Sequence, residues 1–230
     1  LDISYNYNAD TKMLSVMMKQ TQSTDKVFKL PFAIDVYLGG NKTRYNVWMN
    51  NKVDTFTFAV ASKPNLVNVD ADKILLSTKK ESKTLAEYIH QYTYAGKYLD
   101  RKEALDFAAK KSSDSSAVKL LQKALNDPFA ALKIKAIQAL QNTDMDAATI
   151  AAIEILAEKD VSRLVCAEAI DALGSLKDKK YTSLFTKGTN DSSYSVAGAS
   201  LEALALLDEK VAFDLATKLS KFPAKGRLST

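Results

Sequence analysis

The chain has 230 residues, 47% of them hydrophobic, with 7 Gly and 4 Pro, which indicates one or two folded domains and argues against a long disordered linker. Lys and Arg total 32 against 27 Asp and Glu, and because the two signs are interleaved along the chain, we expect no nucleic-acid partner. No apolar run reaches the roughly 20 residues of a membrane-spanning helix, and no signal peptide is visible at the N-terminus. We therefore expect a soluble chain without a membrane segment and assign it no compartment.

Apolar and polar residues alternate along residues 1–80. Successive side chains of a strand point to opposite faces, so this period of two predicts strands with one buried face. Gly39-Gly40 predicts a hairpin turn, and Pro31 places its strand at a sheet edge or at the start of a strand. Six short strands with turns between them predict an antiparallel β-sandwich. The alternating apolar positions are Leu1, Ile3, Tyr5, Tyr7, Leu14, Val16, Met18, Leu30, Phe32, Ile34, Val36, Leu38, Tyr45, Val47, Met49, Phe56, Phe58 and Val60.

From residue 81 onward the apolar period becomes helical. Two helices are predicted within residues 83–111 and a third over 114–126. A helical segment then occurs three times. Its copies, Asp127–Leu140, Asp160–Leu173 and Asp191–Leu204, each begin with Asp and end with Ala-Leu. The starts of successive copies are 33 and 31 positions apart. A chain that repeats one helix at this interval is typical of a repeat protein.

The three copies are predicted to bury the same face. Counted from each Asp, positions five, nine, twelve and thirteen are apolar or small and lie on one side of a helix. Position eleven, which is Gln138, Asp171 or Glu202, is predicted to face water. The Asp is predicted as the N-cap, with Pro128 at the first helical position of the first copy. The predicted buried residues are Leu132, Ala136, Ala139, Leu140, Val165, Ala169, Ala172, Leu173, Val196, Ser200, Ala203 and Leu204.

Each copy follows another predicted helix, at 114–126, 146–158 and 178–187, so the repeating unit is a helical hairpin. A hairpin cannot bury both faces alone, and stacked copies form one continuous core. Residues 81–230 are therefore predicted to be an α-solenoid of HEAT-like units, with a compact helical bundle as the alternative. A last helix, 208–222, has no Asp-led partner after it. We expect the solenoid to be truncated there and this helix to leave apolar surface exposed, the alternative being a polar capping helix.

The sequence offers little catalytic chemistry. With one histidine, His90, it cannot build a two-histidine zinc site, and it lacks HExxH, GxSxG and phosphate-binding glycine motifs. His90 is predicted to be a partly buried helix residue and Cys166 a small buried hydrophobe. Trp48 and the tyrosines around His90 fit a domain junction or a partner anchor. We assign no catalytic, cofactor-binding or metal-binding residue.

A small β-sandwich followed directly by a HEAT-like superhelix resembles the C-terminal half of zinc peptidases of the aminopeptidase N family. Four stretches carry the resemblance over nearly the whole chain, and all are scaffold motifs. They are "LDISYNYNADTKMLSVMMKQTQ" with Gln20 and Gln22, "FKLPFAIDVYL", "KPNLVNVDADKILL" with Pro64 and Asp70, and "YLDRKEAL" with Asp100 and Arg101.

The resemblance implies that this chain is a non-catalytic fragment of a zinc aminopeptidase and is inactive alone. The zinc-binding domain, with HExxH and a downstream Glu, would precede Leu1, and none of its catalytic residues maps onto this sequence. The superhelix would close over the active site, so that peptide N-termini enter and folded chains do not. The implied partners are the catalytic domain of the same chain and the peptide substrate. The alternative is an independent sandwich-plus-solenoid interaction scaffold without peptidase activity, and an inactive family member used as a scaffold would look the same here.

Overall fold

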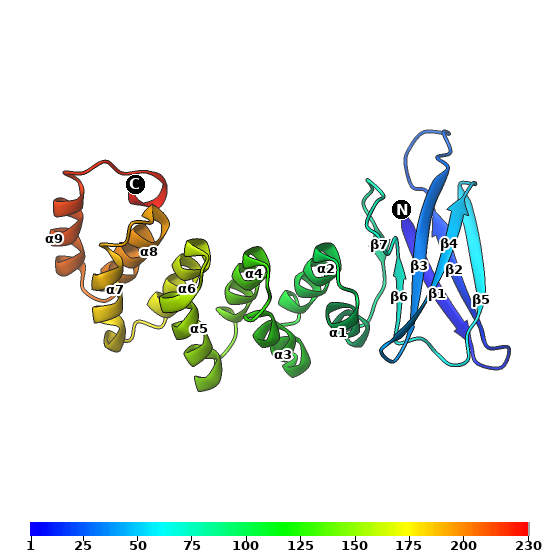
Figure 1. The fold of residues 1–230 in the computed structure, drawn as a ribbon, viewed down its shortest axis with the longest axis horizontal. Helices are drawn as coiled ribbons and strands as arrows, with labels where there is room; N and C mark the ends of the chain where they lie inside the picture. Colours follow the sequence, from blue (N-terminus) through cyan, green and yellow to red (C-terminus); the bar gives the residue numbers. More distant parts are fainter. Residues whose placement is uncertain (230) are drawn as a thin grey trace. The chain divides into compact units, whose positions relative to one another are not determined.

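The computed structural model describes residues 1–229, with strands in the N-terminal part and helices after them, so the predicted order is confirmed (Figure 1). None of the helices in this range is both long and apolar enough to cross a membrane. The strands are β1 Asp2–Asn8, β2 Met13–Lys19, β3 Leu30–Leu38, β4 Asn41–Met49, β5 Val53–Ala59, β6 Leu66–Val69 and β7 Lys80–Glu81.

The strands form two sheets, one with the order β5-β2-β1-β7 and one with the order β4-β3-β6. Gly39-Gly40 joins β3 to β4, and Gly39 has a positive φ of 57°, which confirms the predicted hairpin turn. The prediction of six antiparallel strands is wrong in one respect. A seventh strand, β7, pairs with β1 in parallel over two residues. Two residues are too few to show the alternation from which the other strands were predicted.

Pro31 lies in β3, the central strand of its sheet. The β6 ladder reaches only from Ile34 to Tyr37, so β3 has a partner on one side alone at Pro31. The prediction of an edge strand is therefore wrong, and the prediction of a position near the start of a strand is confirmed. A missing amide donor costs little where no second partner strand is present.

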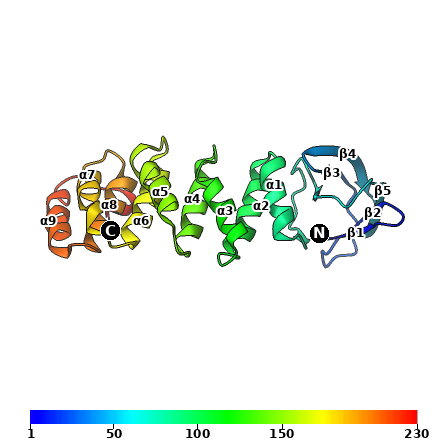
Figure 2. The same cartoon turned by 90° about the horizontal axis from the view of Figure 1, so that it is seen from below.

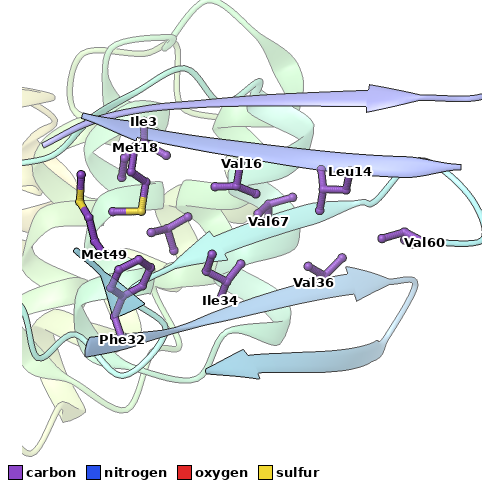
Figure 3. Close-up of a cluster of buried hydrophobic side chains, with 11 residues drawn as sticks. Ile3, Leu14, Val16, Met18, Phe32, Ile34, Val36, Met49, Val60 and Val67 are labelled. Atoms are coloured by element: carbon purple, nitrogen blue, oxygen red, sulfur yellow. The ribbon is translucent and has the colours of Figure 1, made fainter. Parts of the chain in front are cut away.

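The two sheets share one hydrophobic core, in which side chains of β2 face those of β3 and β6 (Figure 3). Leu14, Val16 and Met18 come from β2, and Ile34 and Val36 come from β3. All five are almost completely buried. The alternate residues of β3, among them Asp35 and Tyr37, therefore point away from this core to the outer face of their sheet.

The helices begin directly after the last strand. They are α1 Leu85–Tyr94, α2 Tyr98–Ala109, α3 Ser115–Ala124, α4 Ala130–Leu140, α5 Ala147–Lys159, α6 Arg163–Ser175, α7 Thr182–Gly188, α8 Tyr194–Ala205 and α9 Glu209–Leu219, with short 3₁₀ turns η1 Lys179–Tyr181 and η2 Gly226–Ser229. The compact units of the structure are Leu1–Phe107 and the residues from Ala108 on, so α1 and most of α2 belong with the strands. Residue 80, where we predict the boundary, lies in β7, shortly before the first helix begins at Leu85, whereas the compact units divide after Phe107.

In the second unit, helices pack in successive pairs, α3 with α4, α5 with α6 and α7 with α8. The second helix of each pair also packs on the second helix of the next, α4 on α6 and α6 on α8 (Figures 1 and 2). The stripe predicted from the repeats is buried in all three copies, with Leu140, Leu173 and Leu204 each at 0% exposure. The predicted burial of this face is confirmed.

The aspartates that begin the repeats are not N-caps, contrary to prediction. The N-caps of α4, α6 and α8 are Phe129, Ser162 and Ser193, and none makes a side-chain capping bond. Each carboxylate instead accepts from the N-cap amide: Asp127 from Phe129 at 2.9 Å, Asp160 from Ser162 at 2.8 Å and Asp191 from Ser193 at 2.8 Å. Pro128 consequently precedes the N-cap instead of occupying the first helical position. The aspartates end the loop in a turn, and the N-cap follows two residues later.

Two of these aspartates also link neighbouring repeats. Lys133 of α4 donates to Asp160 at 2.5 Å, and Arg163 of α6 donates to Asp191. Lys133 and Arg163 each belong to the repeat before the aspartate they bind, so the loop that starts each second helix is attached to the preceding second helix. The Asp160 side chain is only 4% exposed, so its ion pair is well shielded from water.

The last helix, α9, leaves apolar surface exposed, as expected, since Phe213 is 70% exposed. After α9 the chain returns to α8, where η2 packs (Figure 1). Arg227 of η2 donates to Asp171 at 2.6 and 2.9 Å and also to Glu202. Asp171 is half-buried by this contact, so the prediction that it faces water freely is wrong, whereas Gln138 and Glu202 are exposed.

The shared face of the repeats can be tested by substitution. Leu173→Ala should lower the free energy of unfolding by about 2–5 kcal/mol, because it opens a cavity between packed helices. Gln138→Ala, on the exposed position of α4, should change it by about 0.5 kcal/mol or less. Urea titrations of both variants give the comparison. Equal losses would contradict the assignment of a buried and an exposed face.

Candidate functional site

The first unit contains a polar cleft of about 320 Å³ on the outer face of the β4-β3-β6 sheet. Strands β3, β4 and β6 form one wall, and residues 95–97, in the turn between α1 and α2, form the other. The charged and hydroxyl groups of the lining belong to Asp35, Tyr37, Lys42, Arg44, Lys97 and Asp100.

Strand register places these side chains together. On the outer face, Asp35 lies opposite Arg44 of β4, and Tyr37 lies opposite Lys42. On its other side, Asp35 lies opposite Asn68 of β6. Helix α1 packs on β6, and the buried Tyr37 forms a small cluster with Leu66 and Ala95. Alternate residues of β3 therefore supply the hydrophobic core on one face and the polar floor of the cleft on the other.

Asp35 is held by a fixed set of cations. Its two oxygens accept from Arg44 Nε at 2.7 Å and Nη2 at 2.9 Å, and Lys42 Nζ donates at 3.2 Å. Arg44 also bridges to Asp72 at 3.0 Å. Burial alone would raise the pKa of the Asp35 carboxyl, but the hydrogen bonds from Arg44 and Lys42 outweigh it, so this pKa lies below its usual value.

Asp100 belongs to a second, buried set of charges. It accepts from Lys73 Nζ at 2.6 Å and from Asn68 Nδ2 at 3.0 Å. The set continues through Lys83, which donates to Glu81 at 3.0 Å and to Gln91 at 2.8 Å. Burial would raise the pKa of Glu81, but the ammonium groups of Lys83 and Lys79 lower it below its usual value.

Three lysines face three carboxylates in this network, so its charges balance. The members are Lys73, Lys79, Lys83, Glu81, Asp100 and Glu103. Because each buried charge has an opposite partner, the arrangement connects the end of the strand region to α1 and α2 without leaving an isolated ion. A balanced, mutually bound set of this kind is suited to holding elements together.

The Tyr37 hydroxyl is different, because it has no hydrogen-bond partner anywhere in residues 1–229. Tyr37 is 3% exposed, and its ring packs edge-on against His90. Burial and the nearby charges of Asp35 and Asp100 raise the pKa of Tyr37 to about 12. The hydroxyl therefore stays protonated at neutral pH and presents a free donor among the cleft residues.

The residues singled out from the sequence do not assemble a catalytic site. His90 lies between Tyr37 and Tyr94, and burial lowers its pKa. Cys166 is completely buried in α6, as predicted, and burial raises the pKa of its thiol. Trp48 is 58% exposed on β4. The tyrosines near His90 make separate contacts: Tyr88 stacks on Phe107, and Tyr94 packs beside His90.

The family resemblance implies a zinc ion in a domain that would precede Leu1, and not in this chain. Within residues 1–229, no group of three or more His, Cys, Asp or Glu side chains is arranged to hold a metal ion. The one histidine, His90, is packed between the aromatic rings of Tyr37 and Tyr94. No step of chemistry is assigned to a metal in this chain.

The second unit contains an apolar groove of about 320 Å³ between α8, α9 and η2. Its lining includes Leu201, Ala212, Phe213 and Leu228. The wall formed by η2 depends on Gly198, where a Cβ atom would lie 2.7 Å from the Cβ of Arg227.

The sequence reasoning did not identify the polar cleft. One signal was present: Asp35 interrupts the apolar run "PFAIDVYL" of β3, and a carboxylate in such a strand needs a partner. The sequence singles out Asp100 only through the family resemblance. The partners of these two residues lie on other strands and helices, so their meeting in one cleft had no local signal.

Comparisons with models of known protein families and with curated protein sequences give no match. Among solved structures, this chain is similar to aminopeptidase A of Legionella pneumophila, determined in complex with aspartic acid, with a TM-score of 0.67 and 9% sequence identity. The similarity covers 96% of this chain and 33% of the aminopeptidase chain, so this chain spans about a third of that protein's length. At this identity the likeness shows a shared fold.

The ion pairs of Asp35 predict an acid-sensitive part of the stability. The folded-state pKa is lower than the unfolded value of about 3.9, so the stability from Asp35 is present above the unfolded value and is lost as pH falls through the folded value. Between about pH 6 and about pH 3, Asp35→Asn should therefore lose less free energy of unfolding than the wild type. Asp25→Asn, at an exposed site without side-chain contacts, is the matched control. If the free energy of unfolding fell with pH equally in the wild type and in Asp35→Asn, the assigned ion pairs would be contradicted.

Proposed function

We propose that this chain is the non-catalytic C-terminal part of a zinc aminopeptidase, built from a β-sandwich followed by a HEAT-like superhelix. The observation that carries the proposal is the fold likeness to a third of an aminopeptidase chain, which extends over 96% of this chain. A likeness that spans both the strands and the helices supports the proposal more strongly than a likeness to either part would. It agrees with the resemblance drawn from the sequence.

The internal organisation of each unit supports the two architectural terms. The two sheets bury their apolar faces in one shared cluster, which is how a sandwich core is built. The helical hairpins repeat the same buried stripe, and each second helix packs on the next, which is the packing of a solenoid. The Lys133–Asp160 and Arg163–Asp191 contacts repeat once per hairpin, so charge reinforces the stacking.

In the proposed function the superhelix closes over the active site of a catalytic domain and restricts access to peptide N-termini. A stack of hairpins linked by both packing and ion pairs supplies a stiff wall for this purpose. The zinc ligands would lie in the catalytic domain that precedes Leu1 in the longer protein. The partners of this chain would be that domain and the peptide substrate.

Exposed apolar side chains recur near the N-terminal ends of the second helices. Phe129 is 49% exposed, Leu164 is 60% exposed and Tyr194 is 39% exposed, one at the start of each of α4, α6 and α8. Exposed apolar side chains are frequent at contacts with another protein or peptide. This observation also favours the second candidate function, an interaction scaffold without peptidase activity.

Substrate selection separates the two functions. In the longer protein, deletion of residues 108–230 should leave hydrolysis of a short aminoacyl-anilide measurable and should increase cleavage of a folded protein that has a free N-terminus. The reason is that the wall that excludes folded chains has been removed. Mass spectrometry of the folded substrate and absorbance of the released aniline measure the two activities. Gln138→Ala, which keeps the wall, is the matched control.

The 230-residue chain alone is the second control. Purified without an affinity tag, it should bind no stoichiometric zinc and hydrolyse no aminoacyl-anilide. Tightly bound zinc with turnover in this chain would overturn the non-catalytic assignment. An unchanged substrate preference after the deletion would contradict the closing role of the superhelix, and no anilide hydrolysis by the longer protein would argue for the scaffold function.

A further inference from the structure

We propose that the polar cleft on the β4-β3-β6 sheet is a binding site for a small oxyanion, a carboxylate or a phosphate group, held by the Tyr37 hydroxyl and the Lys97 and Lys42 ammonium groups. The site lies wholly within the first unit and does not depend on the proposed function. Its volume of about 320 Å³ suits a small molecule or the charged end of a larger one.

The Tyr37 hydroxyl is the first observation that points to a ligand. The Tyr37 ring is buried, but its hydroxyl opens to the cleft, because it is not among the fully buried polar atoms without a partner in residues 1–229. Tyr37 is 97% buried, lines the cleft and has no hydroxyl partner within residues 1–229. Asp35 and Asp100, which line the same cleft, have their own cations and leave this donor unused. A bound acceptor would satisfy the hydroxyl.

The charges of the lining favour an anion as that acceptor. Asp35 is neutralised by Arg44 and Lys42, and Asp100 is neutralised by Lys73. The Lys97 ammonium has no ion pair within the described part of the chain. The side chain of Lys42 has a single carboxylate partner and is 50% exposed, so it keeps donors for a ligand. The lining groups that can still bind a ligand, the Lys97 and Lys42 ammonium groups and the Tyr37 hydroxyl, are therefore hydrogen-bond donors.

The backbone adds to this preference. Gly96 and Lys97 line the cleft and directly precede the 12-residue helix α2. The first-turn amides of a helix have no intrahelical acceptors, and the helix dipole makes this end electropositive. An oxyanion at Lys97 would thus lie beside the positive end of α2 and within the same cleft as the Tyr37 hydroxyl.

The test uses the full 230-residue chain and two probes, inorganic phosphate and acetate, titrated separately at constant ionic strength and neutral pH. Amide chemical shifts of Gly96 and Lys97 report binding at the site. Lys97→Ala and Tyr37→Phe should each raise the dissociation constant about tenfold, the loss expected for one hydrogen bond to a charged group. Lys63→Ala, an exposed lysine of the same unit without side-chain contacts, should leave it unchanged.

Tyr37→Phe keeps the ring and removes only an unpaired hydroxyl, so its thermal unfolding should match that of the wild type. Saturable binding of phosphate, acetate or both that is weakened by Lys97→Ala and Tyr37→Phe supports the site, and the probe that binds identifies the oxyanion. The absence of saturable shifts at millimolar concentrations with both probes overturns it. Binding that all three variants leave unchanged also overturns it, since the anion would then bind elsewhere.

Discussion

The helical unit depends on one packing constraint: the second helix of each hairpin has a stripe of leucine and alanine that its own partner helix covers only in part. Packing α4 on α6 and α6 on α8 buries the rest. The approach is close, since a Cβ atom at Gly174 would lie 2.7 Å from the Cβ of Ala203. Small residues at these contacts let the helices approach, and the leucines beside them fill the remaining space. A stack with this geometry has few alternative arrangements.

In both units, ion pairs join elements that are also packed against one another. In the helical unit, Lys133 and Arg163 attach each following loop through its aspartate. In the first unit, the balanced set around Lys83 and Glu81 connects the strands to α1 and α2. Buried ion pairs add little net stability, but removing one partner is costly, so such sets specify one arrangement against others. The Tyr37 hydroxyl has no partner in either set and opens to the cleft, which is why we propose it as part of a binding site.

The parts of the fold that depend on local periodicity could be predicted from the sequence. The repeated stripe of Leu140, Leu173 and Leu204 gave the correct buried face, whereas β3, predicted to bury one face, buries both faces from Phe32 to Tyr37. The turn before each repeat was missed because an aspartate ahead of a helix can serve as an N-cap or can bind the N-cap amide, and the local sequence is the same. The partly buried state of Asp171 depends on Arg227, 56 residues away, and the cleft depends on the register of three strands and on α1. Such contacts are set by tertiary structure.

In the proposed function, these strands and helices belong to a longer aminopeptidase. Determining the coding sequence upstream of Leu1 in the natural transcript tests it most directly. The account predicts an open reading frame that continues through a catalytic domain with an HExxH motif and a downstream glutamate, which together hold zinc. A stop codon, or an upstream sequence with no such domain, would contradict the aminopeptidase assignment and leave the interaction scaffold as the function.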